Sequence, residues 1–179
     1  RAALSRISHA KNHGVDPAGA YQQAYDAKTE KIAVVYEMYE KKLRRANALD
    51  FDDLLLKTVL LLDQHESIRA TLNAHYRCLM VDEYQDTNRT QYRLIRQLTE
   101  KQQNLCVVGD EDQSIYGWRG ADIQNILSFE KDYPNARIIK LEQNYRSTKN
   151  ILDASGSLVS KNEARKGKTL WTERTGGDP

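Results

Sequence analysis

Two adjacent carboxylates, Asp82 and Glu83, directly follow the four apolar residues 78–81. An Asp-Glu pair at the end of a buried strand can hold a magnesium ion and orient a water molecule beside a bound nucleotide. Ligands of open α/β sheets collect outside the carboxyl ends of the strands, so this position favours such chemistry over a solvated strand end. The residues that come next, Asp86 or Thr87, could instead cap the following helix.

A second apolar run, 105–108, ends in the same way, in Gly109 and Asp110. Gln113 follows shortly afterwards, and its neutral amide could hydrogen-bond a terminal phosphate or a water and so sense a γ-phosphate. The alternative is a loop glutamine that bonds to the backbone. Two strand ends that carry polar groups are typical of one half of a nucleotide site.

An aromatic and basic loop comes next, with Tyr116, Trp118 and Arg119 set between glycines. Aromatic rings beside a cation suit single-stranded nucleic acid, because every base offers a face on which a ring can stack. The alternative is that the tryptophan fills the protein core. The two interpretations differ in whether the indole is exposed.

Tyr145 and Arg146 follow a third apolar run, 137–141. Tyr145 could stack on an adenine, and Arg146 could reach a γ-phosphate as an arginine finger. The alternative is a strand-to-helix turn capped by Ser147 or Thr148, which is compatible with phosphate contact.

The elements that must position these residues alternate between helix and strand. They are, in order, a polar helical segment over 1–48 with a break at 14–17, a buried helix over 50–62, strands at 78–81, 105–108 and 137–141, and helices over 88–100, 122–131 and 148–161. Such alternation predicts a parallel α/β sheet. Three strands are too few for a complete doubly wound domain, so we expect a truncated sheet preceded by an all-helical insertion or neighbouring domain.

The composition indicates an ordinary globular chain. Of 179 residues, 40% are hydrophobic and 29% charged, and no apolar run approaches a membrane span. A net charge of +2 does not by itself indicate a nucleic-acid partner. Cys78 and Cys106 fall in expected strands, where buried free thiols are common, so we expect a cytoplasmic protein without a membrane partner.

The motifs taken together resemble the UvrD/PcrA/Rep family of superfamily 1 DNA helicases. Three successive family motifs correspond to 81–87, to 108–110 with 113–121, and to 141–148, and the stretch 49–54 also resembles the family. The resemblance covers nearly the whole chain and is strongest over residues 47–150.

This resemblance implies an α/β fold, a partial RecA-like P-loop NTPase parallel sheet with helices, preceded by an all-α insertion. Residues 1–48 would end the helical insertion of the first motor domain, 49–141 would form the C-terminal part of that domain, and 142–179 would begin the second. The implied function is a segment of an ATP-dependent 3′-to-5′ DNA helicase that couples hydrolysis to translocation and duplex unwinding, in DNA repair or replication. The implied partners are single-stranded and partly duplex DNA and the remaining segments of the same helicase.

The resemblance also assigns roles in the use of ATP and Mg²⁺. Asp82 would hold the magnesium ion, and Glu83 would activate the hydrolytic water. Gln113 would couple the γ-phosphate to the DNA-binding loop. Tyr145 would face the adenine and Arg146 the γ-phosphate.

On the DNA side, Tyr116 and Trp118 would stack on bases, and Arg119 would link the strand to the acidic motif. One departure concerns phosphate binding: the chain has no Gly-x-x-x-x-Gly-Lys-[Ser/Thr] loop, since 167–169 has its ending without the upstream glycine. The chain also begins at Arg1 rather than Met. We therefore expect a helicase fragment that is inactive by itself.

Two other classes of function remain open from the sequence. One is a non-catalytic DNA-binding or interaction module derived from a helicase, which would agree with the missing phosphate loop. The other is a two-metal nuclease, because clustered carboxylates can hold paired ions. Its candidate ligands are Asp82, Glu83, Asp86, Asp110 and Asp112. A nuclease would leave Gln113, Tyr145 and Arg146 unexplained.

Overall fold

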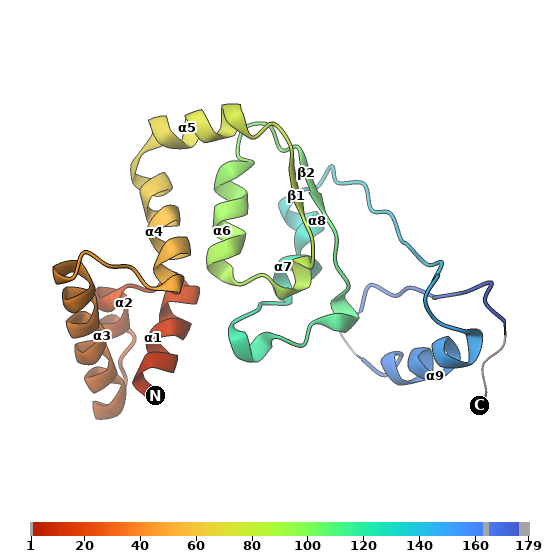
Figure 1. The fold of residues 1–179 in the computed structure, drawn as a ribbon, viewed down its shortest axis with the longest axis horizontal. Coiled ribbons are helices and arrows are strands. Elements are labelled where there is room, and N and C mark those ends of the chain that lie inside the picture. Colours follow the sequence, from red (N-terminus) through yellow and green to blue (C-terminus); the bar gives the residue numbers. More distant parts are fainter. Residues whose placement is uncertain (1, 163–164, 176–179) are drawn as a thin grey trace.

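The computed structural model describes residues 2–162 and 165–175. The chain is rich in helix and has one small parallel sheet of two strands (Figure 1). The helices are α1 (Ala2–Asn12), α2 (Pro17–Gln22), α3 (Ala27–Arg45), α4 (Phe51–Gln64), α5 (Glu66–His75), α6 (Arg89–Leu98), α7 (Gln124–Leu127), α8 (Phe129–Asp132) and α9 (Lys149–Val159). The strands are β1 (Leu79–Val81) and β2 (Leu105–Val107), and three short 3-10 turns are η1 (Tyr84–Asp86), η2 (Glu111–Gln113) and η3 (Gly117–Arg119).

The N-terminal third is helical, as expected. The predicted break between α1 and α2 is confirmed, because Gly14 adopts a φ of +72° and Asp16 then caps α2 through a bond from the Gly19 amide. A capping box between Asp26 and Thr29 starts α3. The N-termini of both helices are therefore set by local side chains.

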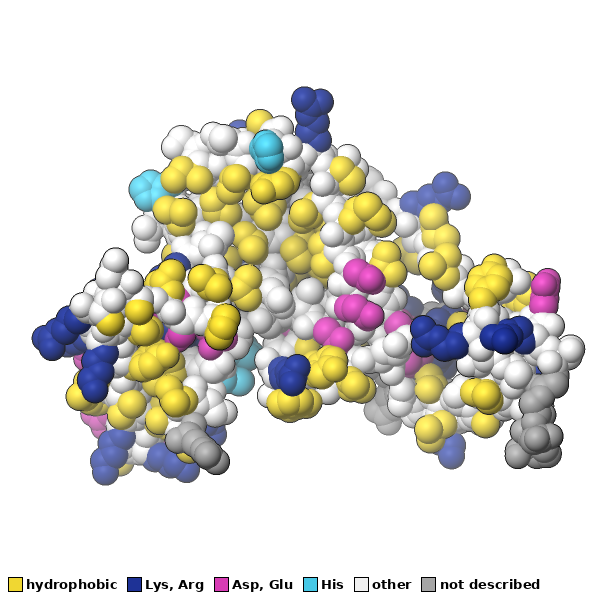
Figure 2. Space-filling model, in the orientation of Figure 1, with side chains coloured by type: hydrophobic (Ala, Val, Ile, Leu, Met, Phe, Trp, Pro, Cys, Tyr) yellow, Lys and Arg dark blue, Asp and Glu magenta, His cyan; other side chains and the backbone are white. Residues whose placement is uncertain are grey.

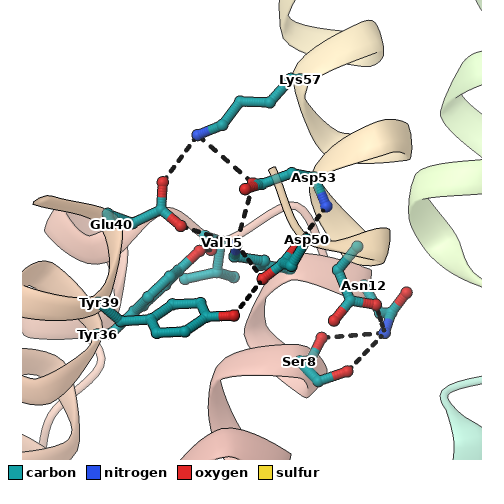
Figure 3. Close-up of polar contacts among 11 residues, drawn as sticks. Ser8, Asn12, Val15, Tyr36, Tyr39, Glu40, Asp50, Asp53 and Lys57 are labelled. Carbon is teal, nitrogen blue, oxygen red and sulfur yellow. Dashed lines mark hydrogen bonds and ion pairs between the residues drawn. The ribbon is translucent and has the colours of Figure 1, made fainter. Parts of the chain in front are cut away.

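A buried ion cluster joins α1, α3 and α4 (Figure 3). The Nζ atom of Lys11, fully buried, lies 2.7 Å from Glu40, 2.8 Å from Asp50 and 2.9 Å from Asp53. Lys57 reaches the other oxygen of Glu40 at 2.8 Å. Burial alone would raise the pKa values of Glu40 and Asp50, but hydrogen bonds from Lys11 hold both below their ordinary values. The cluster keeps its carboxylates charged inside the helical packing.

The sheet brings two chain segments together in parallel. Its paired residues are Leu79 with Leu105, Met80 with Cys106, and Val81 with Val107. The pairing continues beyond the strands, because the amide of Val108 donates to Val81 at 2.8 Å and the amide of Tyr84 donates to Val108 at 2.9 Å. Helix α6 connects the two strands, as the α/β prediction required. The carboxyl ends of β1 and β2 therefore meet at one edge.

The first turn of α6 differs from the prediction. Asn88 is the N-cap: its side chain accepts from the amide of Gln91 at 2.8 Å, and the Gln91 side chain accepts from the amide of Asn88 at 2.9 Å. The prediction of Asp86 or Thr87 as the cap is wrong, because Asp86 belongs to η1 and the hydroxyl of Thr87 donates to the carbonyl of Tyr84.

The predicted third strand is wrong, since residues 137–141 adopt no regular secondary structure. The side chains of Ile139 and Leu141 are 67% and 76% exposed. A strand needs the backbone groups of a neighbour, and an apolar run alone does not supply them. The helix predicted over 122–131 is instead divided into α7 and α8.

Two predictions of burial are also wrong. Cys78 and Cys106 are exposed rather than buried, and Met80, which pairs with Cys106, is 73% exposed. Helix α4 buries Leu56 but leaves Leu54 56% exposed, so it is not covered on all sides. Figure 2 shows hydrophobic side chains gathered on the face where Figure 1 places α4, α5 and α6. Within the described part of the chain, no helix is both long and apolar enough to cross a membrane.

Replacing Lys11 with methionine should destabilise the chain by about 3–5 kcal/mol, because the buried carboxylates would lose their counterion. Urea denaturation at pH 7, followed by circular dichroism, measures this change. The control Lys41→Met removes only an exposed pair with Glu37 and should cost less than about 1 kcal/mol. Equal free energies of unfolding for the two variants would contradict the importance of the cluster.

Candidate functional site

The acidic pair lies at the carboxyl end of β1, as predicted, in a constrained turn. Glu83 adopts a left-handed conformation with φ of 50°, which costs a residue with a side chain about 1–2 kcal/mol. The carboxylate of Asp82 accepts a hydrogen bond from the amide of Glu83 at 2.9 Å. Both residues are exposed, so the turn presents two carboxylates at the edge of the sheet.

A chain of hydrogen bonds connects this turn to the end of β2. The side-chain amide of Gln85, only 1% exposed, donates to Glu83 at 2.8 Å, and its oxygen accepts from the amide of Asp110 at 3.0 Å. The carboxylate of Asp110 in turn accepts from the side chain of Gln113 at 2.7 Å. We call Glu83, Gln85, Asp110 and Gln113 the polar relay.

Packing fixes the middle of the polar relay. A Cβ atom on Gly109 would lie 2.7 Å from the side-chain oxygen of Gln85 and 2.8 Å from Ile126, so only glycine allows this close approach. Tyr84, fully buried, packs edge-on against Phe129 with ring centres 5.6 Å apart. Burial raises the pKa of Tyr84, which keeps its phenol neutral. The side chain of Gln85 therefore lies directly against Gly109 and follows a buried aromatic residue in the chain.

The aromatic loop is exposed rather than part of the core. The guanidinium carbon of Arg119 lies 4.7 Å from the ring centre of Trp118 and 5.2 Å from that of Tyr116. The indole of Trp118 is 76% exposed, so it does not fill the protein core. An exposed indole stacked with a guanidinium has the form of a surface for base stacking.

Tyr145 and Arg146 lie on an exposed turn after the predicted third strand. The side chain of Asn144 accepts from the amides of Arg146 and Ser147 at 3.0 and 2.8 Å, which shapes the turn. Among the described residues, no contact joins the side chain of Arg146 to Glu83. Two hollows of the described surface lie elsewhere, beside α2 and α3 and beside α5 and α6.

The carboxylates differ in how they could serve a metal ion. In the part of the chain that the structure describes, no three His, Cys, Asp or Glu side chains gather as a metal site. Mg²⁺ commonly takes only one or two carboxylates and completes its shell with phosphate oxygens and water, a mode that suits the exposed Asp82. Asp110 and Asp112 are instead ion-paired with Lys168 and Arg165, respectively. Two of the five carboxylates considered as ligands of a two-metal nuclease are therefore already paired with basic side chains.

Three contributors to this site could not be assigned from the sequence alone. For Gln85, the only clue in the sequence is its position two residues after Glu83. Gly109 is a glycine at the end of an apolar run, a position typical of close backbone approach. Lys168 gives no local clue, because its partner Asp110 lies far away along the chain.

Comparisons with known proteins agree with the motifs. A family model described as the UvrD/REP helicase N-terminal domain matches residues 1–134. Proteins named ATP-dependent DNA helicase PcrA from Staphylococcus epidermidis and Staphylococcus aureus are each 51% identical to the chain over 175 residues. Each alignment covers 98% of this chain and 24% of the relative. The chain thus spans about a quarter of the length of the curated relatives it matches.

Replacing Gly109 with alanine should destabilise the chain by about 1–3 kcal/mol, because the new methyl group would displace Gln85 or Ile126. The control Gly156→Ala introduces a methyl group with nothing within 4 Å, in the middle of α9, and should be neutral or slightly stabilising. Thermal denaturation compares the two variants. An unchanged midpoint for Gly109→Ala would show that the polar relay tolerates displacement.

Proposed function

This chain belongs to the UvrD/REP helicase family, and from that premise we propose that it is a segment of an ATP-dependent DNA helicase. We assign residues 49–141 to the C-terminal part of a RecA-like motor domain, 1–48 to its helical insertion, and 142–179 to the start of a second motor domain. The complete protein would move 3′-to-5′ on single-stranded DNA and unwind duplexes during repair or replication. We assign this action to the cytoplasm.

The observation that carries this proposal is the polar relay at the carboxyl edge of β1 and β2. Bound ATP with Mg²⁺ supplies a γ-phosphoryl group whose transfer to water releases free energy. One carboxylate oxygen of Asp82 would hold the magnesium ion. The carboxylate of Glu83 would accept a proton from the attacking water, and its bond from Gln85 orients it for that task.

Gln113 provides the proposed connection between nucleotide and DNA. Its side-chain amide bonds to Asp110 here, and its backbone leads within a few residues to Tyr116 and Trp118. With one amide hydrogen held by Asp110, the other could donate to a γ-phosphate, and this contact would shift the loop that follows. The presence or absence of the γ-phosphate would in this way reach the DNA-binding surface.

The aromatic loop is the proposed contact with single-stranded DNA. Tyr116 and Trp118 would stack on bases, since stacking is worth about 1–3 kcal/mol per base and does not depend on sequence. Arg119, stacked on both rings, would link the strand to the acidic turn. This combination suits a motor that must grip any sequence it passes.

The exposed turn at Tyr145 would complete the nucleotide site from the second motor domain. Tyr145, 75% exposed, would face the adenine, and the exposed Arg146 would contact the γ-phosphate. An arginine that reaches the phosphate from a second domain stabilises charge that develops during transfer. The non-catalytic alternative is not favoured, because the matched relatives are named as ATP-dependent helicases.

In a full-length protein that carries this sequence, Glu83→Gln should retain ATP binding but lower the rate of hydrolysis by about 10²–10⁴-fold, the contribution of a general base. A phosphate-release assay and a fluorescent nucleotide titration measure the two properties separately. The control Glu30→Gln changes an exposed carboxylate at the start of α3 and should leave both unchanged. Normal turnover in Glu83→Gln would refute the assigned role.

In the same protein, Trp118→Ala should weaken binding of single-stranded DNA by about 1–3 kcal/mol, because one stacking surface is lost. Fluorescence anisotropy with a labelled oligonucleotide measures the affinity. Tyr25→Ala is the matched control, since Tyr25 is an aromatic residue that is 85% exposed between α2 and α3. Equal affinity for the two variants would argue against a DNA contact at the aromatic loop.

A further inference from the structure

The segment that follows α9 returns to the acidic loop 110–112 after β2 (Figure 1). The Nε atom of Arg165 lies 3.1 and 3.0 Å from the two carboxylate oxygens of Asp112, and its Nη2 atom lies 2.9 Å from one of them. Lys168 forms an ion pair with Asp110. Two cations of one segment thus hold two carboxylates of one loop.

These ion pairs are more shielded than ordinary surface pairs. The side chain of Asp112 is 7% exposed and that of Arg165 is 19% exposed. Burial would raise the pKa of Asp110, but the hydrogen bond from Lys168 lowers it below its ordinary value. A forked arginine contact and partial burial both strengthen an ion pair and reduce its screening by salt.

The backbone on each side of Lys168 is held in place. Gly167 adopts a φ of +68°, and its carbonyl accepts from the ammonium of Lys140 at 2.6 Å. The amide of Thr169 donates to the side chain of Glu142 at 2.9 Å. Lys168 is therefore presented to Asp110 by a backbone that is fixed before and after it.

The same segment continues to the turn that carries Arg146. The amide of Trp171 donates to the carbonyl of Glu142 at 2.9 Å, and the amide of Asn144 donates to the carbonyl of Trp171 at 2.7 Å. The side chain of Arg174 donates to the carbonyl of Arg146 at 2.7 Å. One short segment thus contacts both the loop of Gln113 and the turn of Arg146, which share no side-chain hydrogen bond within the part of the chain that the structure describes.

We propose that residues 165–174, the strap, couple these two parts of the nucleotide site, and that Lys168 is a positioning residue for Gln113. The inference rests on the proposed function, in which Gln113 and Arg146 both approach the γ-phosphate. Asp110 connects Lys168 to Gln113, because one of its carboxylate oxygens contacts Lys168 and the other accepts a hydrogen bond from Gln113. Without the ammonium, the Asp110 carboxylate keeps, among the described residues, only its bonds from the amide of Asp112 and from Gln113, so Gln113 is bonded to a partner that is held less firmly.

The test compares three variants of a full-length protein that carries this sequence: Lys168→Met, Lys168→Arg and the control Lys161→Met. Lys161 is an exposed lysine just after α9 whose ammonium has no contact among the described residues. Two measurements are made on each variant. One is DNA-stimulated ATP hydrolysis with varied ATP, and the other is hydrogen exchange of the amides of residues 111–114.

For Lys168→Met we expect kcat to fall about tenfold while KM for ATP changes less than about twofold, because a misplaced Gln113 fails in the transition state rather than in binding. We also expect about tenfold faster exchange of the loop amides, with exchange in α6 unchanged. Lys168→Arg, which keeps the charge, should restore most of both properties. Lys161→Met should behave as the unmodified protein does.

Identical behaviour of Lys168→Met and Lys161→Met in loop exchange would overturn the strap, as would a Lys168→Arg variant no better than Lys168→Met. A different result would overturn the proposed function: an unmodified protein without DNA-stimulated hydrolysis. In that case the exchange data still decide whether Lys168 holds the loop. The two failures are therefore distinguishable.

Discussion

The fully buried ammonium of Lys11 is the interaction on which the helical part of the structure depends. It neutralises carboxylates from α3 and from the start of α4, and so joins α1 to both of these helices. Tyr36 and Tyr39 place their rings 5.9 and 5.2 Å from the same ammonium. An ion cluster of this kind is specific about geometry, because removing one partner leaves the others charged and buried.

The end of α1 also contacts the start of α6, the helix between β1 and β2. The hydroxyl of Thr90 in α6 donates to the carbonyl of Lys11 at 3.0 Å, and the side chain of Asn88 donates to Asn12 at 2.7 Å. Asn88 in turn forms an isolated antiparallel bridge with Ala121, directly after the aromatic loop. The N-terminal helices and the proposed DNA contact are therefore connected through the N-terminus of α6, the helix that joins β1 to β2.

The two parallel strands determine where the polar side chains of the candidate site lie. Their aligned carboxyl ends bring Glu83 close enough to Asp110 for one glutamine to bond to both. The strap adds a further set of contacts. Its cations Arg165 and Lys168, which follow α9 in the chain, form ion pairs with Asp112 and Asp110 in the loop after β2. Around this edge, charge and hydrogen bonding act together with the packing of Tyr84 and Gly109 to connect the elements.

The sequence predicted the parts of the site that depend on local pattern. The apolar runs before Asp82 and Gly109 were sufficient to place two strands and their polar ends, because a short apolar run bounded by polar residues is typical of a strand. The run 137–141 contains three apolar residues beside Arg137 and Lys140 and is no strand, since strand pairing is decided by distant backbone that a local pattern does not report.

Long-range ion pairs were beyond prediction for a related reason. Lys11 lies in a polar helix and resembles any solvated lysine, and it becomes buried only because Asp50 and Glu40 converge on it from other helices. Lys168 and Asp110 likewise meet through the path of the chain. The exposed Cys106 shows the converse, an apolar position in a strand that remains exposed.

We expect the polar relay to couple the acidic turn energetically to the DNA loop. The most direct measurement is a double-mutant cycle on DNA-stimulated ATP hydrolysis, with Gln85→Leu, Gln113→Leu and the double variant in a full-length protein. If the relay acts as one unit, the double variant should be about as impaired as the worse single variant, a coupling of about 1 kcal/mol or more. Losses that simply multiply would mean that the two glutamines act independently, and the claim would fail.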